Sequence, residues 1–101
     1  KIQWTSDIKS IADSKLVIEA VIENMEVKQK TFSDVESLVS NDCIISTNTS
    51  SLSVGEIALS CSNLTRIMGI HFFNPVPLMK MVEVVPVEQT EPSLIENVRS
   101  I

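Results

Sequence analysis

Short runs of β-branched residues alternate with amphipathic segments along this chain, and that alternation constrains the fold more than any other feature. Residues 16–22 read LVIEAVI and residues 43–47 read CIIST. Such runs are typical of strands buried on both faces of a parallel sheet. Further strands are expected at 66–72 and 81–85, with a short one at 2–5. Strands that alternate with helices predict an α/β fold with a mostly parallel sheet and flanking helices.

The expected helices have recognisable starts. Asn24 is a suitable N-cap after the first long strand, and Ser53 opens a capping box with Glu56. Ser6 is expected to cap a short helix near the start of the chain, and Pro92 to begin the last helix. The apolar residues expected on inner helix faces are Met25, Phe32, Val35, Leu38 and Val39, and in the last helix Leu94, Ile95, Val98 and Ile101.

Composition excludes several kinds of partner. The chain has 101 residues, enough for one small domain, and a formal net charge of −5 without a basic stripe. That charge argues against nucleic acid as a ligand. No apolar run approaches the roughly 20 residues of a membrane helix. Cys43 and Cys61 belong to no metal-binding motif, so we expect reduced, structural thiols and no metal site.

Polar residues fall where the expected strands end. In an open α/β sheet, ligands bind at the carboxyl ends of the strands. The residues at these ends are therefore expected to face one crevice. They are Glu23 and Asn24 after the first long strand, Asn48, Thr49 and Ser50 after the second, and His71 and Asn74 at the end of the third.

His71 is the only histidine, and its imidazole can accept a proton near neutral pH. Glu83 follows twelve residues later in an apolar run and could hydrogen-bond the far ring nitrogen, which would fix the tautomer of the imidazole. Ser50 offers a hydroxyl for a substrate oxygen. Asn74 offers an amide that could orient a substrate or cofactor group.

Structural alternatives stand beside each of these readings. His71 could be a satisfied structural residue, and strand alternation could point Glu83 to solvent. Ser50 and Asn74 could be turn residues, and Glu23 with Lys28 could belong to a solvated helix start. A Ser–His–acid hydrolase would use Ser50, His71 and Glu83, but the sequence has no G-x-S-x-G elbow around Ser50.

Three segments read together resemble one family. They are LVIEAVIENMEVKQKTF, STNTSSLSVGEIA and GIHFFNPVPLMKMVEVV. In this order and spacing they resemble the L-3-hydroxyacyl-CoA dehydrogenase family, including its 3-hydroxybutyryl-CoA members. The resemblance implies reversible oxidation of an (S)-3-hydroxyacyl-CoA to the 3-ketoacyl-CoA with NAD. Such a reaction would serve fatty-acid β-oxidation or butyrate-type metabolism.

The resemblance also implies roles for individual residues. His71 matches the general base and Glu83 its acidic partner. Ser50 matches the serine that binds the substrate oxygen near the nicotinamide, and Asn74 also belongs to the catalytic site. The cofactor contacts that the resemblance implies are Glu23, Lys28, Asn48, Ser50 and Asn74.

Two parts of the family pattern are missing. The first βαβ unit of the family carries a G-x-G-x-x-G turn, whereas this chain has only Gly55 and Gly69. The helical C-terminal domain is also missing. We therefore expect residues 1–101 to form the C-terminal half of a Rossmann-type, NAD-binding domain. We expect a homo-oligomer, in which a domain swap is one route to association, and a bacterial cytoplasm rather than a mitochondrial matrix. The alternative is a non-catalytic, self-associating α/β fragment.

Overall fold

The computed structural model describes residues 4–49, 51–72 and 82–99. None of the helices within these ranges is long and apolar enough to cross a membrane. The elements in chain order are η1 (Ile8–Ile11), β1 (Leu16–Glu19), α1 (Met25–Leu38), β2 (Ile44–Thr47), α2 (Val54–Ala58), β3 (Ile67–Phe72), β4 (Val82–Pro86) and α4 (Pro92–Arg99).

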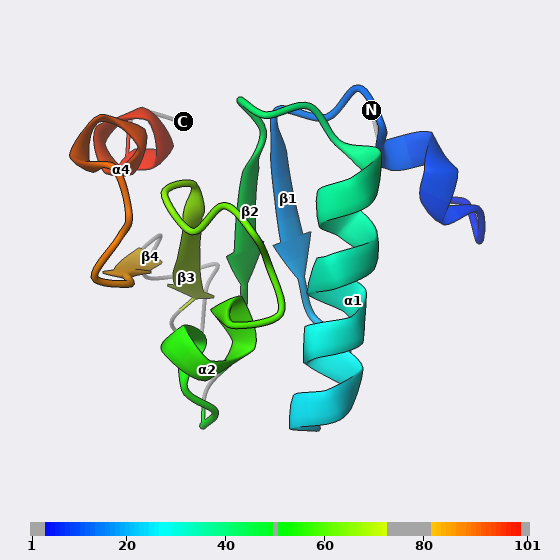
Figure 1. Cartoon of the computed structure of the whole chain (residues 1–101), viewed down its shortest axis with the longest axis horizontal. Coiled ribbons are helices and arrows are strands. Elements are labelled where there is room, and N and C mark those ends of the chain that lie inside the picture. Colours follow the sequence, from blue (N-terminus) through cyan, green and yellow to red (C-terminus); the bar gives the residue numbers. More distant parts are fainter. Residues whose placement is uncertain (1–3, 50, 73–81, 100–101) are drawn as a thin grey trace.

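The strands form one sheet in the order β1-β2-β3-β4. β1, β2 and β3 run parallel, and β4 runs antiparallel to β3 (Figure 1). The register places Glu19 beside Thr47 and Thr47 beside Gly69, while His71 lies opposite Glu83. The expected mostly parallel sheet with flanking helices is confirmed.

Helices cover both faces of this sheet. On one face, α1 and α2 pack on the strands around a cluster of buried residues. On the other face, α4 packs through Leu94, Ile95 and Val98, as expected from its apolar spacing. The first cluster contains Phe32, Val35, Val39, Cys43, Ile45, Ile57, Ala58 and Ile67. The second contains Ile44, Met68, Ile70 and Val98.

Two of the expected helix caps are confirmed. The backbone N–H of Val27 donates to Oδ1 of Asn24 at 3.1 Å, and that of Glu56 donates to Oγ of Ser53 at 3.3 Å. The cap expected at Ser6 is wrong, because Asp7 caps η1, which is a single 3₁₀ turn. Residues 4 and 5 are not in a strand, and the rest of the strand expected at 2–5 lies outside the described residues.

β1 differs from the strand that its sequence predicts. It ends at Glu19 rather than at Ile22, and it is not buried on both faces, because Ile18 is exposed; Ile22, in the loop that follows, is also exposed. β1 is one of the two outer strands of the described sheet, and the cluster under α4 includes Leu16 but not Ile18. Glu19, in contrast, is buried on the face that α1 covers.

Gly69 allows α2 to approach the sheet closely. A Cβ atom at this position would lie 2.9 Å from Cγ2 of Val54 in α2 and 3.3 Å from Cβ of Val85 in β4. Real Cβ contacts essentially never reach the shorter of these distances. The missing side chain therefore lets α2 begin directly above the middle of β3.

Candidate active site

The parallel strands bring polar residues to one edge of the sheet. The arrowheads of β1, β2 and β3 point to the same edge, and α1 begins at this edge, beyond the arrowhead of β1 (Figure 1). Glu23 and Asn48 follow β1 and β2 at this edge, and His71 lies near the end of β3. Ser50 and Asn74, both expected in the site, lie outside the described residues.

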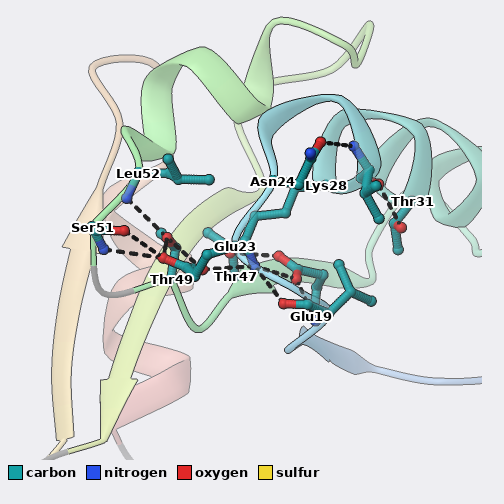
Figure 2. A network of polar contacts seen from close by, with 11 residues as sticks. Glu19, Glu23, Asn24, Lys28, Thr31, Thr47, Thr49, Ser51 and Leu52 are labelled. Carbon is teal, nitrogen blue, oxygen red and sulfur yellow. Dashed lines mark hydrogen bonds and ion pairs between the residues drawn. The ribbon is translucent and has the colours of Figure 1, made fainter.

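Glu23 links the loop after β1 to the turn after β2. Oγ1 of Thr49 donates to its Oε2 at 2.8 Å, and Oγ of Ser51 donates to the same oxygen at 2.7 Å (Figure 2). The backbone N–H of Ser51 adds a third bond to this oxygen at 3.3 Å. One carboxylate therefore holds the residues on both sides of position 50 in the sequence.

The hydrogen bonds to Glu23 have an electrostatic consequence. The hydroxyls of Ser51 and Thr49, with a smaller effect from Lys28, lower the pKa of Glu23 from 4.5 to about 2. Donors that bind the charged form of a carboxyl favour ionisation. Glu23 is therefore an anion at neutral pH, and its side chain is 40% exposed to solvent.

Glu19 and Lys28 form a buried ion pair next to Glu23. Nζ of Lys28 lies 2.6 Å from Oε2 of Glu19, and the side chains of both residues are only 1% exposed. The other oxygen of Glu19 accepts the hydroxyl of Thr47 at 2.6 Å, and Oε2 also accepts the N–H of Val21 at 2.7 Å. Both carboxylate oxygens of Glu19 are therefore satisfied (Figure 2).

The ammonium of Lys28 has three partners for its three N–H groups. They are Oε2 of Glu19, the carbonyl of Val21 at 3.1 Å and Oε1 of Glu23 at 3.2 Å. Burial lowers the pKa of Lys28, but its hydrogen bonds with Glu19 and Glu23 outweigh that effect, so the pKa is raised overall. Lys28 therefore carries a full charge in the interior.

The sequence reasoning missed this pair. The sequence predicted Lys28 either at the cofactor or on a solvated helix start, and it predicted no role for Glu19. Two signals were available. Lys28 lies four residues before Phe32 on the buried helix face. Glu19 lies two residues after Val17, which packs toward α1, so both strand residues point to the same face.

His71 and Glu83 are opposite residues of the antiparallel pair β3 and β4. Nδ1 of His71 lies 3.8 Å from Oε1 of Glu83. The imidazole is 36% exposed and the carboxylate 56% exposed. Glu83 therefore reaches solvent, as strand alternation alone predicts, and it also lies within ion-pair distance of the only histidine in the chain.

The arrangement suits proton transfer beside a bound polar ligand. The imidazole of His71 is partly exposed, and the carboxylate of Glu83 lies close to it on the paired strand. Hydroxyl, amide and carboxylate groups gather at the neighbouring strand ends. Among the residues that the structure describes, no group of three or more His, Cys, Asp and Glu side chains could hold a metal ion.

Comparison with known proteins identifies relatives across the whole chain. The family described as 3-hydroxyacyl-CoA dehydrogenase, NAD binding domain, matches residues 1–101. The 3-hydroxybutyryl-CoA dehydrogenase of Clostridioides difficile is 46% identical over 81 residues, which are 80% of this chain and 29% of that protein. The peroxisomal bifunctional enzyme of Cavia porcellus is 37% identical over 98 residues, which are 97% of this chain and 14% of that protein.

A solved structure supports the same assignment. The crystal structure of 3-hydroxybutyryl-CoA dehydrogenase from Escherichia coli K12 matches with a TM-score of 0.88 at 40% identity. The match covers 93% of this chain and 20% of that one. The expected Rossmann-type fold class is thereby confirmed. This chain spans less than a third of the length of each of these three proteins.

Proposed function

This chain belongs to the family of 3-hydroxyacyl-CoA dehydrogenase NAD-binding domains, and we propose that it supplies the general base and part of the cofactor site of such an enzyme. The proposed reaction is the reversible oxidation of an (S)-3-hydroxyacyl-CoA to the 3-ketoacyl-CoA with NAD. The observation that carries the proposal is the placement of His71 beside Glu83 at the sheet edge to which β1 and β2 also lead.

The residues at this edge fit part of NAD. Glu23, Thr49 and Ser51 offer a carboxylate and two hydroxyls, and Asn48 offers an amide, groups that can bind ribose hydroxyls and a carboxamide. The chain has only Gly55 and Gly69, so the G-x-G-x-x-G turn that binds the pyrophosphate in the first βαβ unit of the family is not part of it. We assign these residues to the ribose and nicotinamide side of the cofactor, together with Ser50 and Asn74.

His71 performs the acid–base step in this proposal. Oxidation of a secondary alcohol requires that its hydroxyl proton be removed, and the imidazole accepts that proton. The carboxylate of Glu83, 3.8 Å from Nδ1, stabilises the imidazolium that forms. In the reverse direction the imidazolium returns the proton. When bound, NAD accepts the hydride, so the protein has to position and polarise the substrate.

We also propose that residues 1–101 are the second half of a larger nucleotide-binding domain in a homo-oligomeric enzyme. β1 has a partner strand on only one side among the described residues, and Ile18, Val21 and Ile22 near it are exposed. An open strand edge with apolar neighbours favours pairing with further chain segments. We propose a bacterial cytoplasmic location, with the mitochondrial matrix as the alternative.

The test replaces His71 by Gln in a full-length dehydrogenase that carries this chain. Turnover of 3-hydroxybutyryl-CoA should fall by about 10²- to 10⁴-fold, the usual contribution of a general base. The dissociation constant for NAD should stay close to that of the unsubstituted protein, because His71 acts on the substrate. A variant that keeps most of its turnover would refute the assignment of the base.

A further inference from the structure

Glu19 is a buried carboxylate that the proposed reaction does not use. It is 4% exposed and lies at the end of β1, between Thr47 of β2 and Lys28 of α1. Its bonds therefore join three elements at the edge of the sheet where the proposed cofactor residues lie. A carboxylate in that position needs a physical reason, because burying a charge is unfavourable unless it is paired and hydrogen-bonded.

Stability alone is a weak reason for such a pair. The cost of desolvating two buried charges often equals or exceeds their attraction, and apolar residues of similar volume can replace them without loss. A charged pair forms directional hydrogen bonds, which an apolar pair cannot form. Glu19 and Lys28 therefore restrain the positions of their partners more closely than the packing of β1 against α1 requires.

Lys28 cannot itself contact a ligand in this arrangement. Its side chain is 1% exposed, and Glu19, Val21 and Glu23 occupy its three N–H groups. Of its two carboxylate partners, Glu19 is buried and Glu23 reaches solvent, with a side chain that is 40% exposed. The cofactor contact that the family resemblance implies for Lys28 would then be indirect.

We propose that Glu19 is a positioning residue of the cofactor site, which acts through Lys28 on Glu23 and so on Thr49 and Ser51. This inference rests on the proposed function, in which Glu23 lies at NAD. Glu19 holds the ammonium of Lys28 at 2.6 Å, so that Glu23, at 3.2 Å, is its more distant partner. Glu23 then keeps its Oε2 for the hydroxyls of Thr49 and Ser51.

The consequence of neutralising Glu19 follows from the same distances. Without the charge of Glu19, Glu23 is the nearest carboxylate to the ammonium of Lys28. The ammonium moves toward Glu23 and competes with Thr49 and Ser51 for its oxygens. Thr49 and Ser51 lose their fixed orientation, although the sheet and α1 keep their packing.

The experiment is a double-mutant cycle on NAD affinity in the full-length dehydrogenase that carries this chain. Glu19→Gln, Glu23→Gln and the double variant are titrated with NAD by calorimetry. Glu19→Gln should weaken NAD binding by about tenfold, as loss of a buried charged hydrogen-bond partner commonly does. In the Glu23→Gln background the same change should weaken it by less than about twofold, because contacts that act through one residue are not additive.

Ser46→Ala is the matched control. The hydroxyl of Ser46 is also buried and also joins β2 to β1, through a 2.8 Å bond to the carbonyl of Val17. It lies one residue before Thr47 and has no bond to Lys28 or Glu23 among those that the structure describes. This variant should lower the thermal stability and leave the dissociation constant for NAD unchanged.

The outcomes separate this proposal from the proposed function. If Glu19→Gln does not fold, Thr47→Val takes its place in the cycle, because it removes the donor to Oε1 of Glu19 and keeps the charges. Equal effects in both Glu23 backgrounds, or an unchanged NAD affinity, would overturn the role of Glu19 alone. Absence of saturable NAD binding by the unsubstituted protein would overturn the proposed function and this inference with it.

Discussion

Replacement of Lys28 by Met should destabilise the domain strongly. The substitution keeps the length and much of the volume of the side chain but removes the ammonium and its three bonds. Glu19, 4% exposed, then keeps only Thr47 and the N–H of Val21 as donors and has no counter-charge. Breaking a buried pair on one side costs about 3–5 kcal/mol, a large part of the roughly 5–15 kcal/mol that stabilise a typical domain.

Removing both charges should restore most of that loss. In the double variant Glu19→Gln with Lys28→Met, the amide of residue 19 can accept from Val21 and donate to the hydroxyl of Thr47. Neutral replacements of buried pairs are often close to the original stability. The free energy of unfolding of the double variant should therefore exceed that of the single Lys28→Met variant by about 2 kcal/mol or more.

Native-state hydrogen exchange in the full-length dehydrogenase measures this locally. The amides of Ile44 and Asn48 bond to the carbonyls of Lys15 and Glu19 at 2.9 and 2.8 Å, so both report the opening of β1 from β2. Their opening free energies should fall in Lys28→Met and recover in the double variant. Opening free energies within about 1 kcal/mol of the unsubstituted protein in Lys28→Met would refute this account of the buried pair.

Three further outcomes are expected. Glu83→Gln should lower kcat by about tenfold or more through His71. Glu91→Gln removes another exposed carboxylate and should leave kcat unchanged; equal rates in the two variants would rule out a role of Glu83 in turnover. Gly69→Val should cost about 1–3 kcal/mol in urea unfolding, because the new Cβ would meet α2 at 2.9 Å; unchanged stability would contradict that close contact. The pKa of Glu23 is about 2 in the folded state and ordinarily 4.5. Its contribution to folding stability should therefore be complete above pH 4.5 and disappear as the pH falls toward 2. A carboxyl ¹³C titration of Glu23 with a midpoint near 4.5 would contradict the lowered pKa.

Features set by local hydrogen bonds were predictable from the sequence. Asn24 and Ser53 cap their helices through donors three residues ahead, so the residue type and the spacing suffice to identify them. The buried face of α4 followed in the same way from the spacing of Leu94, Ile95 and Val98. Strand positions were likewise correct to within a residue or two for β2, β3 and β4.

Features set by distant neighbours were not predictable. The apolar run after Lys15 does not reveal that β1 lies at the outside of the described sheet, which leaves Ile18 and Ile22 exposed. Local patterns place Glu19 and Lys28 on buried faces, but the contact between the two side chains comes from the way β1 and α1 pack. Of the proposed catalytic residues, His71 and Glu83 could be paired from their spacing, but the antiparallel direction that makes them opposite comes from the fold.

The antiparallel direction of β4 also affects how the domain assembles. His71 and Glu83 are twelve residues apart, whereas Glu19 and Thr47, neighbours in the parallel part, are 28 residues apart and have all of α1 between them. Contacts between residues that are close in the sequence close smaller loops, and they form sooner than contacts across a crossover connection. The pair proposed for proton transfer therefore depends on short-range chain closure, and the turn proposed for the cofactor depends on completed assembly of β1, α1 and β2. Substitutions that slow the crossover should delay cofactor binding during refolding more than they delay the pairing of β3 with β4.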